Sequence, residues 1–234
     1  MKDISFPSCQ DCEIQEGFFC AFSPGVKAEI GQDKKHLTIK KGEYLFKSGA
    51  YTVGLYCLYK GKVKLTKMGK DGKEQILRFS KPGDIIGYRS LLNQEPYQAS
   101  AIAIEDVYVC LILKNTFLSM VDKNRHFSKN IINLLGDDLK TAEESILGLS
   151  QKSVQERIAE SLVLLVNTYG YKEDGKTINI KLSRAEIASL AGTTQETTIR
   201  TLAKMEKEGY LELNKKEISI PDFNKLMSGT TLFD

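Results

Sequence analysis

The chain has 234 residues, of which 41% are hydrophobic and 27% are charged, and its formal net charge is +3. This composition is typical of a folded protein rather than a disordered one, and the length fits one large domain or two ordinary ones. There is no apolar signal segment and no run of roughly 18 apolar residues for a membrane helix, so we expect a soluble cytoplasmic protein. The small net charge excludes a chain-wide field for nucleic acid, and five Cys are too few for a disulfide scaffold.

The segment from residue 40 to residue 114 contains short strands separated by turns. Residues 62–66 alternate polar and apolar side chains, which is the period of a half-buried strand, and residues 75–79 are the expected return strand after an Asp-Gly turn. The other expected strands are residues 44–47, 54–59, 99–103 and 107–113. Many short strands at this spacing predict a barrel or a jelly roll.

The hydrophobic period becomes helical from about Asn115. Six apolar residues then recur at intervals of three and four: Ile132, Leu135, Leu139, Ala142, Ile146 and Leu149. Such a narrow stripe favours a seam with a second helix, and so a homodimer. The alternative is an amphipathic helix that lies on its own barrel, and both interpretations remain open. Residues 151–153 interrupt the stripe and are the expected hinge.

Two capped helices around a glycine follow in the last third of the chain. Ser183 and Glu186 have the spacing of a capping box, and Gly192 breaks the helix that they begin. Residues 193–196 form a second expected capping box, and its helix extends through Lys207. This pattern predicts a helix-turn-helix.

The flanking segments predict a wing. Residues 210–213 and 217–220 alternate around a polar turn, as the two strands of a hairpin do. Residues 177–182 are expected to form a further short strand ahead of the helix-turn-helix.

From about Leu37 to Pro221 the chain resembles the Crp/Fnr superfamily of bacterial transcription regulators. The helix-turn-helix at residues 182–207 carries most of the resemblance, and five barrel glycines fall in the family pattern: Gly42, Gly49, Gly61, Gly83 and Gly87. The resemblance implies an α+β fold with a cyclic-nucleotide-binding-like β-barrel, a long dimerisation helix and a C-terminal winged helix-turn-helix. The expected boundaries are 1–22 for a Cys-containing segment, 23–125 for the effector-sensing barrel, 126–152 for the dimerisation helix and hinge, and 153–234 for the DNA-binding domain.

The expected partners are a second copy of the chain, double-stranded DNA with a palindromic site, and RNA polymerase. The second helix of the motif is expected in a major groove, where Arg200 can bind guanine and Glu196, on the same face, can accept from cytosine. The other candidate base-reading residues are Gln195 and Ile199, and the candidate phosphate contacts are Arg184, Thr194 and Lys204. The plainer alternative is that Glu196 only caps the helix, or pairs with Arg200 on its surface.

The barrel departs from the pattern that cyclic-AMP binders share. The resemblance aligns their phosphate cassette with residues 87–90, where Tyr88 replaces a Glu, and aligns their Arg-Ser pair with Tyr97 and Gln98. We therefore expect no cyclic-nucleotide site.

The cysteines point to another signal. Cys9 and Cys12 form a C-x2-C pair, which can share a metal or a cluster, and Cys20 follows. The oxygen-sensing branch of the family has a similar set with a fourth cysteine in the barrel, where Cys110 lies, and this resemblance implies a [4Fe–4S] cluster. Cys57 has apolar neighbours and is expected in the core.

The cofactor stays unassigned at this point. Zinc, a disulfide switch and ordinary buried thiols are alternatives for the cysteines, and His36 or His126 could bind a haem. An enzyme is not expected, because the chain has no glycine-rich phosphate loop, nucleophile elbow or His-rich metal motif. A jelly-roll metal enzyme is the alternative from that class.

Overall fold

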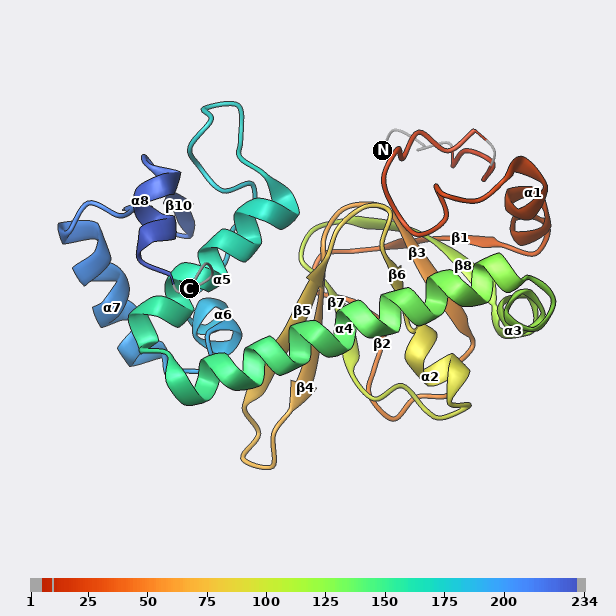
Figure 1. Ribbon diagram of the computed structural model, residues 1–234, viewed down its shortest axis with the longest axis horizontal. Helices are drawn as coiled ribbons and strands as arrows, with labels where there is room; N and C mark the ends of the chain where they lie inside the picture. Colours follow the sequence, from red (N-terminus) through yellow and green to blue (C-terminus); the bar gives the residue numbers. More distant parts are fainter. Residues whose placement is uncertain (1–5, 10, 231–234) are drawn as a thin grey trace. The chain divides into compact units, whose positions relative to one another are not determined.

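The computed structural model describes residues 6–9 and 11–230 (Figure 1). The chain divides into two compact units, Met1–Lys67 with Leu77–Asp137, and Met68–Ile76 with Asp138–Asp234. Within the described part of the chain, no helix combines the length and the apolar character that crossing a membrane requires.

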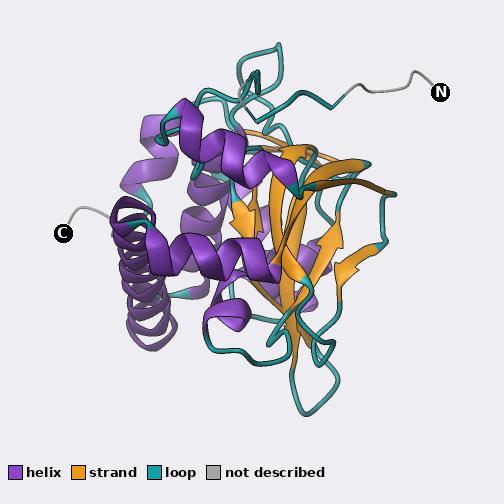
Figure 2. Cartoon of the chain, turned by 90° about the vertical axis from the view of Figure 1, so that its right-hand side faces the viewer, coloured by secondary structure: helices purple, strands orange, loops and turns teal. Residues whose placement is uncertain are grey.

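The first unit is built around two four-stranded sheets, whose strands are orange in Figure 2. One sheet has the order β1 (Lys35–Ile39), β8 (Val107–Leu113), β3 (Gly54–Lys60) and β6 (Ile85–Ile86). The other has the order β2 (Tyr44–Phe46), β7 (Ser100–Ala103), β4 (Val63–Met68) and β5 (Glu74–Ser80). All six expected strands are present, so the predicted strand-rich half is confirmed.

Alternation along the central strands produces two separate cores. Tyr56 and Leu58 of β3 are buried between the sheets with Val109 of β8. Leu55 of β3 and Ile112 of β8 point to the opposite side and pack in a second cluster with helical side chains. The outer face of the β3–β8 pair is therefore covered rather than exposed to solvent.

Four helices accompany the sheets. They are α1 (Pro24–Gln32), α2 (Tyr88–Leu92), α3 (Lys114–Lys123) and α4 (Arg125–Gln151). Phe117 of α3 and Phe127 of α4 are fully buried in the outer cluster, with ring centroids 5.9 Å apart. Phe18 of the N-terminal segment meets Phe127 edge-on at 5.4 Å, so the same cluster anchors that segment.

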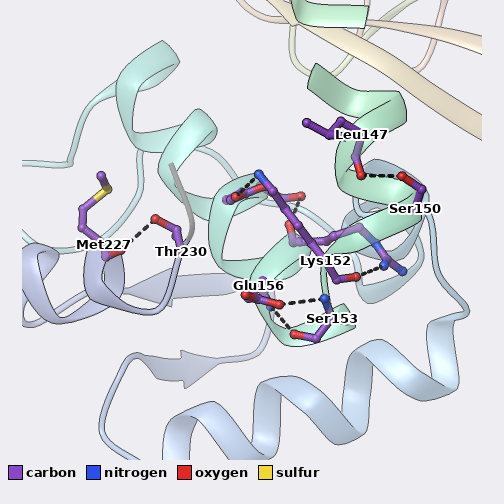
Figure 3. A network of polar contacts seen from close by, with 10 residues as sticks. Leu147, Ser150, Lys152, Ser153, Glu156, Met227 and Thr230 are labelled. Atoms are coloured by element: carbon purple, nitrogen blue, oxygen red, sulfur yellow. Dashed lines mark hydrogen bonds and ion pairs between the residues drawn. The ribbon is translucent and has the colours of Figure 1, made fainter. Parts of the chain in front are cut away.

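The long helix ends where the sequence predicts a hinge. α4 stops at Gln151, and α5 (Val154–Tyr169) begins after Ser153. Ser153 and Glu156 form a capping box, in which the Ser153 side chain accepts from the Glu156 N–H and the Glu156 carboxylate accepts from the Ser153 N–H (Figure 3). Such a box fixes the start of α5 independently of α4.

The second unit is a winged helix-turn-helix. It continues from α5 through α6 (Arg184–Leu190), α7 (Gln195–Lys207), β9 (Glu212–Asn214), β10 (Glu217–Ser219) and α8 (Phe223–Ser228). β9 and β10 pair antiparallel as the predicted wing. The capping box of Ser183 and Glu186 is also confirmed at the start of α6.

Two local predictions are wrong. The N-cap of α7 is Thr194, whose side chain accepts from the Thr197 N–H, because the helix starts one residue later than the expected box requires. Residues 177–182 form two isolated bridges instead of a strand. The Asn179 N–H turns back to the Gly170 carbonyl, which prevents an extended ladder.

Candidate functional site

One face of α7 presents the predicted base-reading side chains. Gln195, Glu196, Ile199 and Arg200 are all exposed, and on the opposite side the buried residues are Thr198, Leu202 and Met205. The two sets follow the helical period, so packing of α7 on its own unit turns the candidate side chains outward. Thr198 is fully buried, and its hydroxyl donates to the Thr194 carbonyl at 3.0 Å.

The plainer reading of Glu196 and Arg200 finds no support in the geometry. Glu196 does not cap the helix, because Thr194 does so through Thr197. Among the residues that the structure describes, neither Glu196 nor Arg200 forms an ion pair. Both side chains are thus available to an incoming ligand.

The phosphate candidates differ in how accessible they are. Lys204 is exposed and lies 3.8 Å from the Glu208 carboxylate, a surface pair that contributes little. The Thr194 hydroxyl donates to the Thr197 hydroxyl at 2.9 Å, so its proton is already engaged.

Arg184 is more buried than a side chain that contacts a DNA phosphate is expected to be. Its Nη1 atom is buried and has no hydrogen-bond partner in the described residues. Burial lowers the pKa of the guanidinium, and the Glu206 carboxylate of α7 opposes that shift. Arg184 therefore lies beside α7 instead of extending freely toward a phosphate.

Arg157 of α5 holds the turn of the motif, and sequence reasoning did not identify it. Its Nε donates to the Ala191 carbonyl at 2.9 Å, and its Nη1 donates to the Lys152 carbonyl at 2.7 Å. Next to this turn, a Cβ on Gly192 would lie 2.5 Å from the Leu149 side chain, and the φ of Gly192 is +60°. The turn therefore requires glycine, and Arg157 links it to the hinge.

The predicted dimer seam is largely uncovered along α4. Ile132, Leu139 and Ile146 are 66%, 60% and 68% exposed, whereas Phe127 and Ile131 on the other side of the helix are buried in the outer cluster. Leu135 is half-buried, and Ala142 and Leu149 are exposed. The first half of α4 thus packs on the first unit, and the residues of the stripe other than Leu135 stay exposed.

Aromatic side chains fill the space between the two sheets. Tyr97 stacks on Phe46 with ring centroids 3.8 Å apart and donates its hydroxyl to the Gly54 carbonyl at 2.9 Å. Tyr88, at the position of the cassette Glu, lies in the outer cluster instead, where it is 1% exposed and its hydroxyl accepts from Arg78 at 3.1 Å.

A cavity of about 50 Å³ lies on the outer face of β3 and β8, under the N-terminal segment. One water molecule needs roughly 10–15 Å³ by the same measure, so the cavity has room for a larger group. Five thiols line it: Cys9, Cys12, Cys20, Cys57 and Cys110. All five are free and half-buried. The structure thus brings the four predicted cysteines together and adds a fifth.

Cys57 is a cavity residue that the sequence analysis did not identify as one. Tyr56 and Leu58 face the inner core, so Cys57 between them faces outward, directly opposite Cys110 on β8. It packs against the outer core cluster, as the sequence predicts, and it also borders the cavity, which the sequence did not predict. Strand alternation combined with the β3–β8 register was the signal that could have found it.

Close backbone contacts hold the cover of the cavity in place. The Phe18 N–H donates to the Gly83 carbonyl at 3.1 Å, next to a point where Gly17 approaches Gly83. The Lys34 ammonium donates to the Pro7 carbonyl at 2.8 Å. The Cys20 thiol donates to the Ile14 carbonyl at 3.1 Å.

Two lysines border the same cavity and act on its thiols. Burial raises the pKa of Cys110 to about 11, and the nearby Lys34 ammonium opposes the shift. Burial and Cys12 raise the pKa of Cys20, and Lys27 opposes that shift. Positive charge at these two points favours the thiolate forms that metals bind.

The cavity is not a preformed site for a single ion. Within the described residues, no group of three or more His, Cys, Asp or Glu side chains is arranged to hold a metal ion. His36 stacks on Phe6 at 4.4 Å and His126 lies edge-on to Phe22 at 5.3 Å. Neither histidine lines the cavity.

Comparison with known families agrees with both units. Residues 36–124 match the family model of the cyclic nucleotide-binding domain, and residues 156–228 match that of the Crp-like helix-turn-helix domain. The first range spans the two sheets, and the second spans α6, α7 and the wing.

Similar proteins extend the match to nearly the whole chain. An anaerobic regulatory protein of Pasteurella multocida is 30% identical over 230 residues, which cover 95% of this chain and 83% of that protein. Electron transport regulator A of Shewanella oneidensis is 31% identical over 223 residues, which cover 93% and 88%. The solved structure of FixK2 from Bradyrhizobium japonicum shares the fold at 23% identity, with a TM-score of 0.76 over 86% of this chain and 99% of its own. The chain therefore belongs to the Crp/Fnr family of DNA-binding transcription regulators, and not to a family of enzymes.

Proposed function

We propose that this regulator senses oxygen or a redox signal through an iron–sulfur cluster bound in the thiol-lined cavity. The observation that carries the proposal is the convergence of Cys9, Cys12 and Cys20 of the N-terminal segment with Cys110 of β8 on one cavity. The names of the relatives, an anaerobic regulatory protein and an electron transport regulator, support the same kind of signal.

The donor set fits such a group better than it fits a single ion. Each cysteine of a four-iron cluster binds a different iron, so the sulfurs stand further apart than the four ligands of one zinc ion do. Lys27 and Lys34 would offset part of the negative charge of four thiolates. The lining also includes apolar side chains, among them Ile14, Phe19 and Ile112. A bound cluster would supply a centre whose integrity depends on oxygen. Cys9, Cys12, Cys20 and Cys110 would hold it, and the N-terminal segment would shield it.

The output of the proposed sensor is DNA binding. Regulators of this family bind DNA and act as dimers. In this chain the exposed stripe on α4 supports pairing with a second copy, and α7 presents its reading face to one half of an inverted repeat. We propose the cytoplasm as its location, because a bacterial transcription regulator acts where the DNA lies, and RNA polymerase as a further partner.

The barrel interior is proposed as structural rather than ligand-binding. Phe46, Tyr56 and Tyr97 occupy it, and Tyr88 stands where the resemblance aligns the Glu of cyclic-AMP binders. Micromolar binding of cyclic AMP or cyclic GMP in calorimetry would contradict this part of the proposal.

The test is anaerobic purification followed by iron and sulfide analysis, visible absorption, and gel shifts before and after exposure to air. The expected result is a cluster-containing protein whose affinity for an inverted-repeat duplex changes with air. Cys12→Ser should remove the iron, and Gln15→Ala, an exposed neighbour in the same segment that does not line the cavity, should keep it. A wild-type protein that takes up no iron, or takes up zinc alone, would contradict the proposal.

A further inference from the structure

The sheet contributes two thiols to the cavity, although a cluster with three ligands in the N-terminal segment needs only one from the sheet. Cys57 and Cys110 are partners in the β3–β8 register and face the same side. Directly opposite residues on antiparallel strands have Cβ atoms about 4.5–5.5 Å apart. A metal–thiolate bond spans about 2.3 Å, as in zinc sites, so an iron atom bound by one sulfur lies within rotamer reach of the other.

We propose that Cys57 is an alternative ligand to Cys110, so that either sheet thiol can occupy the same iron position of the site. This inference rests on the proposed function and adds a residue to it. The site then has five thiols for four positions, and loss or oxidation of Cys110 does not by itself empty it.

The position of Cys57 among the thiols supports this role. Cys57 lies directly opposite Cys110 in the β3–β8 register, and it lines the same cavity as Cys9, Cys12 and Cys20. Either sheet thiol therefore faces the three thiols of the N-terminal segment across one cavity.

The N-terminal thiols have no such substitute. Cys9, Cys12 and Cys20 lie in an irregular segment, where no second thiol is held opposite them by a strand register. The proposal therefore predicts that single substitutions of the sheet cysteines and of the N-terminal cysteines differ in how much iron the protein keeps.

The experiment is anaerobic reconstitution with ferrous iron and sulfide, followed by desalting, iron analysis and visible circular dichroism. Cys57→Ser and Cys110→Ser should each keep more than half of the wild-type iron, and Cys110→Ser should show a changed visible spectrum because a different residue ligates. The double variant Cys57→Ser/Cys110→Ser should lose nearly all iron. Cys12→Ser, the matched control from the N-terminal segment, should lose nearly all iron as a single substitution.

The outcomes separate the two proposals. Loss of all iron from a folded Cys110→Ser protein would overturn the role of Cys57, and so would retention of iron in the double variant. Neither result would contradict the proposal that the wild-type protein binds a cluster. A wild-type protein without iron would overturn both. Far-ultraviolet circular dichroism checks that each variant is folded. If Cys110→Ser unfolds, the iron content of Cys110→Ala, which retains apolar packing, is compared with that of the wild-type protein instead.

Discussion

Gly17 and Gly83 approach each other so closely that neither position has room for a side chain. A Cβ on Gly83 would lie 2.1 Å from the Glu16 carbonyl oxygen, and a Cβ on Gly17 would lie 2.5 Å from the Cα of Gly83. Both glycines also have positive φ, 152° and 95°. This contact holds the N-terminal segment against the rest of the first unit, beside the thiol cavity.

Gly83→Ala should therefore destabilise the first unit and loosen the cover of the cavity. A positive φ alone costs about 1–2 kcal/mol for a non-glycine residue, and the clash with backbone should add roughly 1–3 kcal/mol. Gly42→Ala is the matched control, because Gly42 has a φ of +84° but open space around it. Thermal unfolding and limited proteolysis within residues 11–22 measure the effect. Equal losses for the two variants would show that the contact contributes nothing.

Glu217 should make the second unit sensitive to acid. Its carboxylate accepts from Lys172 at 2.7 Å and Lys181 at 2.9 Å, and these hydrogen bonds lower its pKa from 4.5 to about 2. A depressed folded pKa gives stability that is complete above the unfolded pKa and is lost as the pH falls from about 4.5 toward 2.

Glu217→Gln should lower the melting temperature at pH 7, and its difference from wild type should shrink across that acid range. Glu212→Gln is the control from the same hairpin, since its pair with Lys176 is about half exposed. Melting curves at several pH values test both. A constant difference between Glu217→Gln and wild type from pH 7 to pH 2 would rule out the linkage.

Much of this architecture could be predicted because the hydrophobic residues of these segments recur at the spacing of a strand or a helix. The strands, the stripe on α4 and the box of Ser183 and Glu186 depend on local spacing, which a sequence shows directly. β1, β6, α1 and α2 were not predicted. β6 has only two residues, too few to show a period, and the alternation in β1 is short, with only Leu37 and Ile39 half-buried.

The thiol cavity could be predicted only in part. The C-x2-C spacing identified Cys9 and Cys12, and the resemblance supplied Cys20 and Cys110. Cys57 required the pairing register of β3 with β8, which is a tertiary fact. Likewise, Arg157 donates to the Ala191 carbonyl, 34 residues away, and no local pattern marks such a bond.

The apolar stripe on α4 should hold two copies together. Changing Leu139 and Ile146 to Glu would place charges in the seam, where burial without a partner is unfavourable, so the double variant should be monomeric by light scattering. Asn133→Glu with Lys140→Glu is the matched control, because both residues are exposed and lie outside the stripe. A dimeric Leu139→Glu/Ile146→Glu protein would place the interface elsewhere.

The reading face of α7 makes the most specific prediction. Two recognition helices in a dimer lie about one DNA turn apart, roughly 34 Å, so the protein should select an inverted repeat with that spacing between half-sites. Arg200 is an exposed donor without an ion pair in the described structure, and it suits guanine; Glu196, one turn earlier, suits cytosine. Binding selection from randomised duplexes should recover a G·C pair at a fixed place in each half-site.

Two substitutions on α7 then separate base reading from phosphate contact. Arg200→Ala should cost on the order of 1–3 kcal/mol per half-site and flatten the preference for guanine, because it removes a bidentate contact to a base edge. Lys204→Ala, one turn later on the same face, should weaken binding to all sequences about equally and lower the salt slope by about one per subunit. Selections and salt titrations with both variants measure the difference. If Arg200→Ala keeps the wild-type sequence preference and affinity, Arg200 does not contact a base, and specificity must come from Gln195, Ile199 or the shape of the DNA.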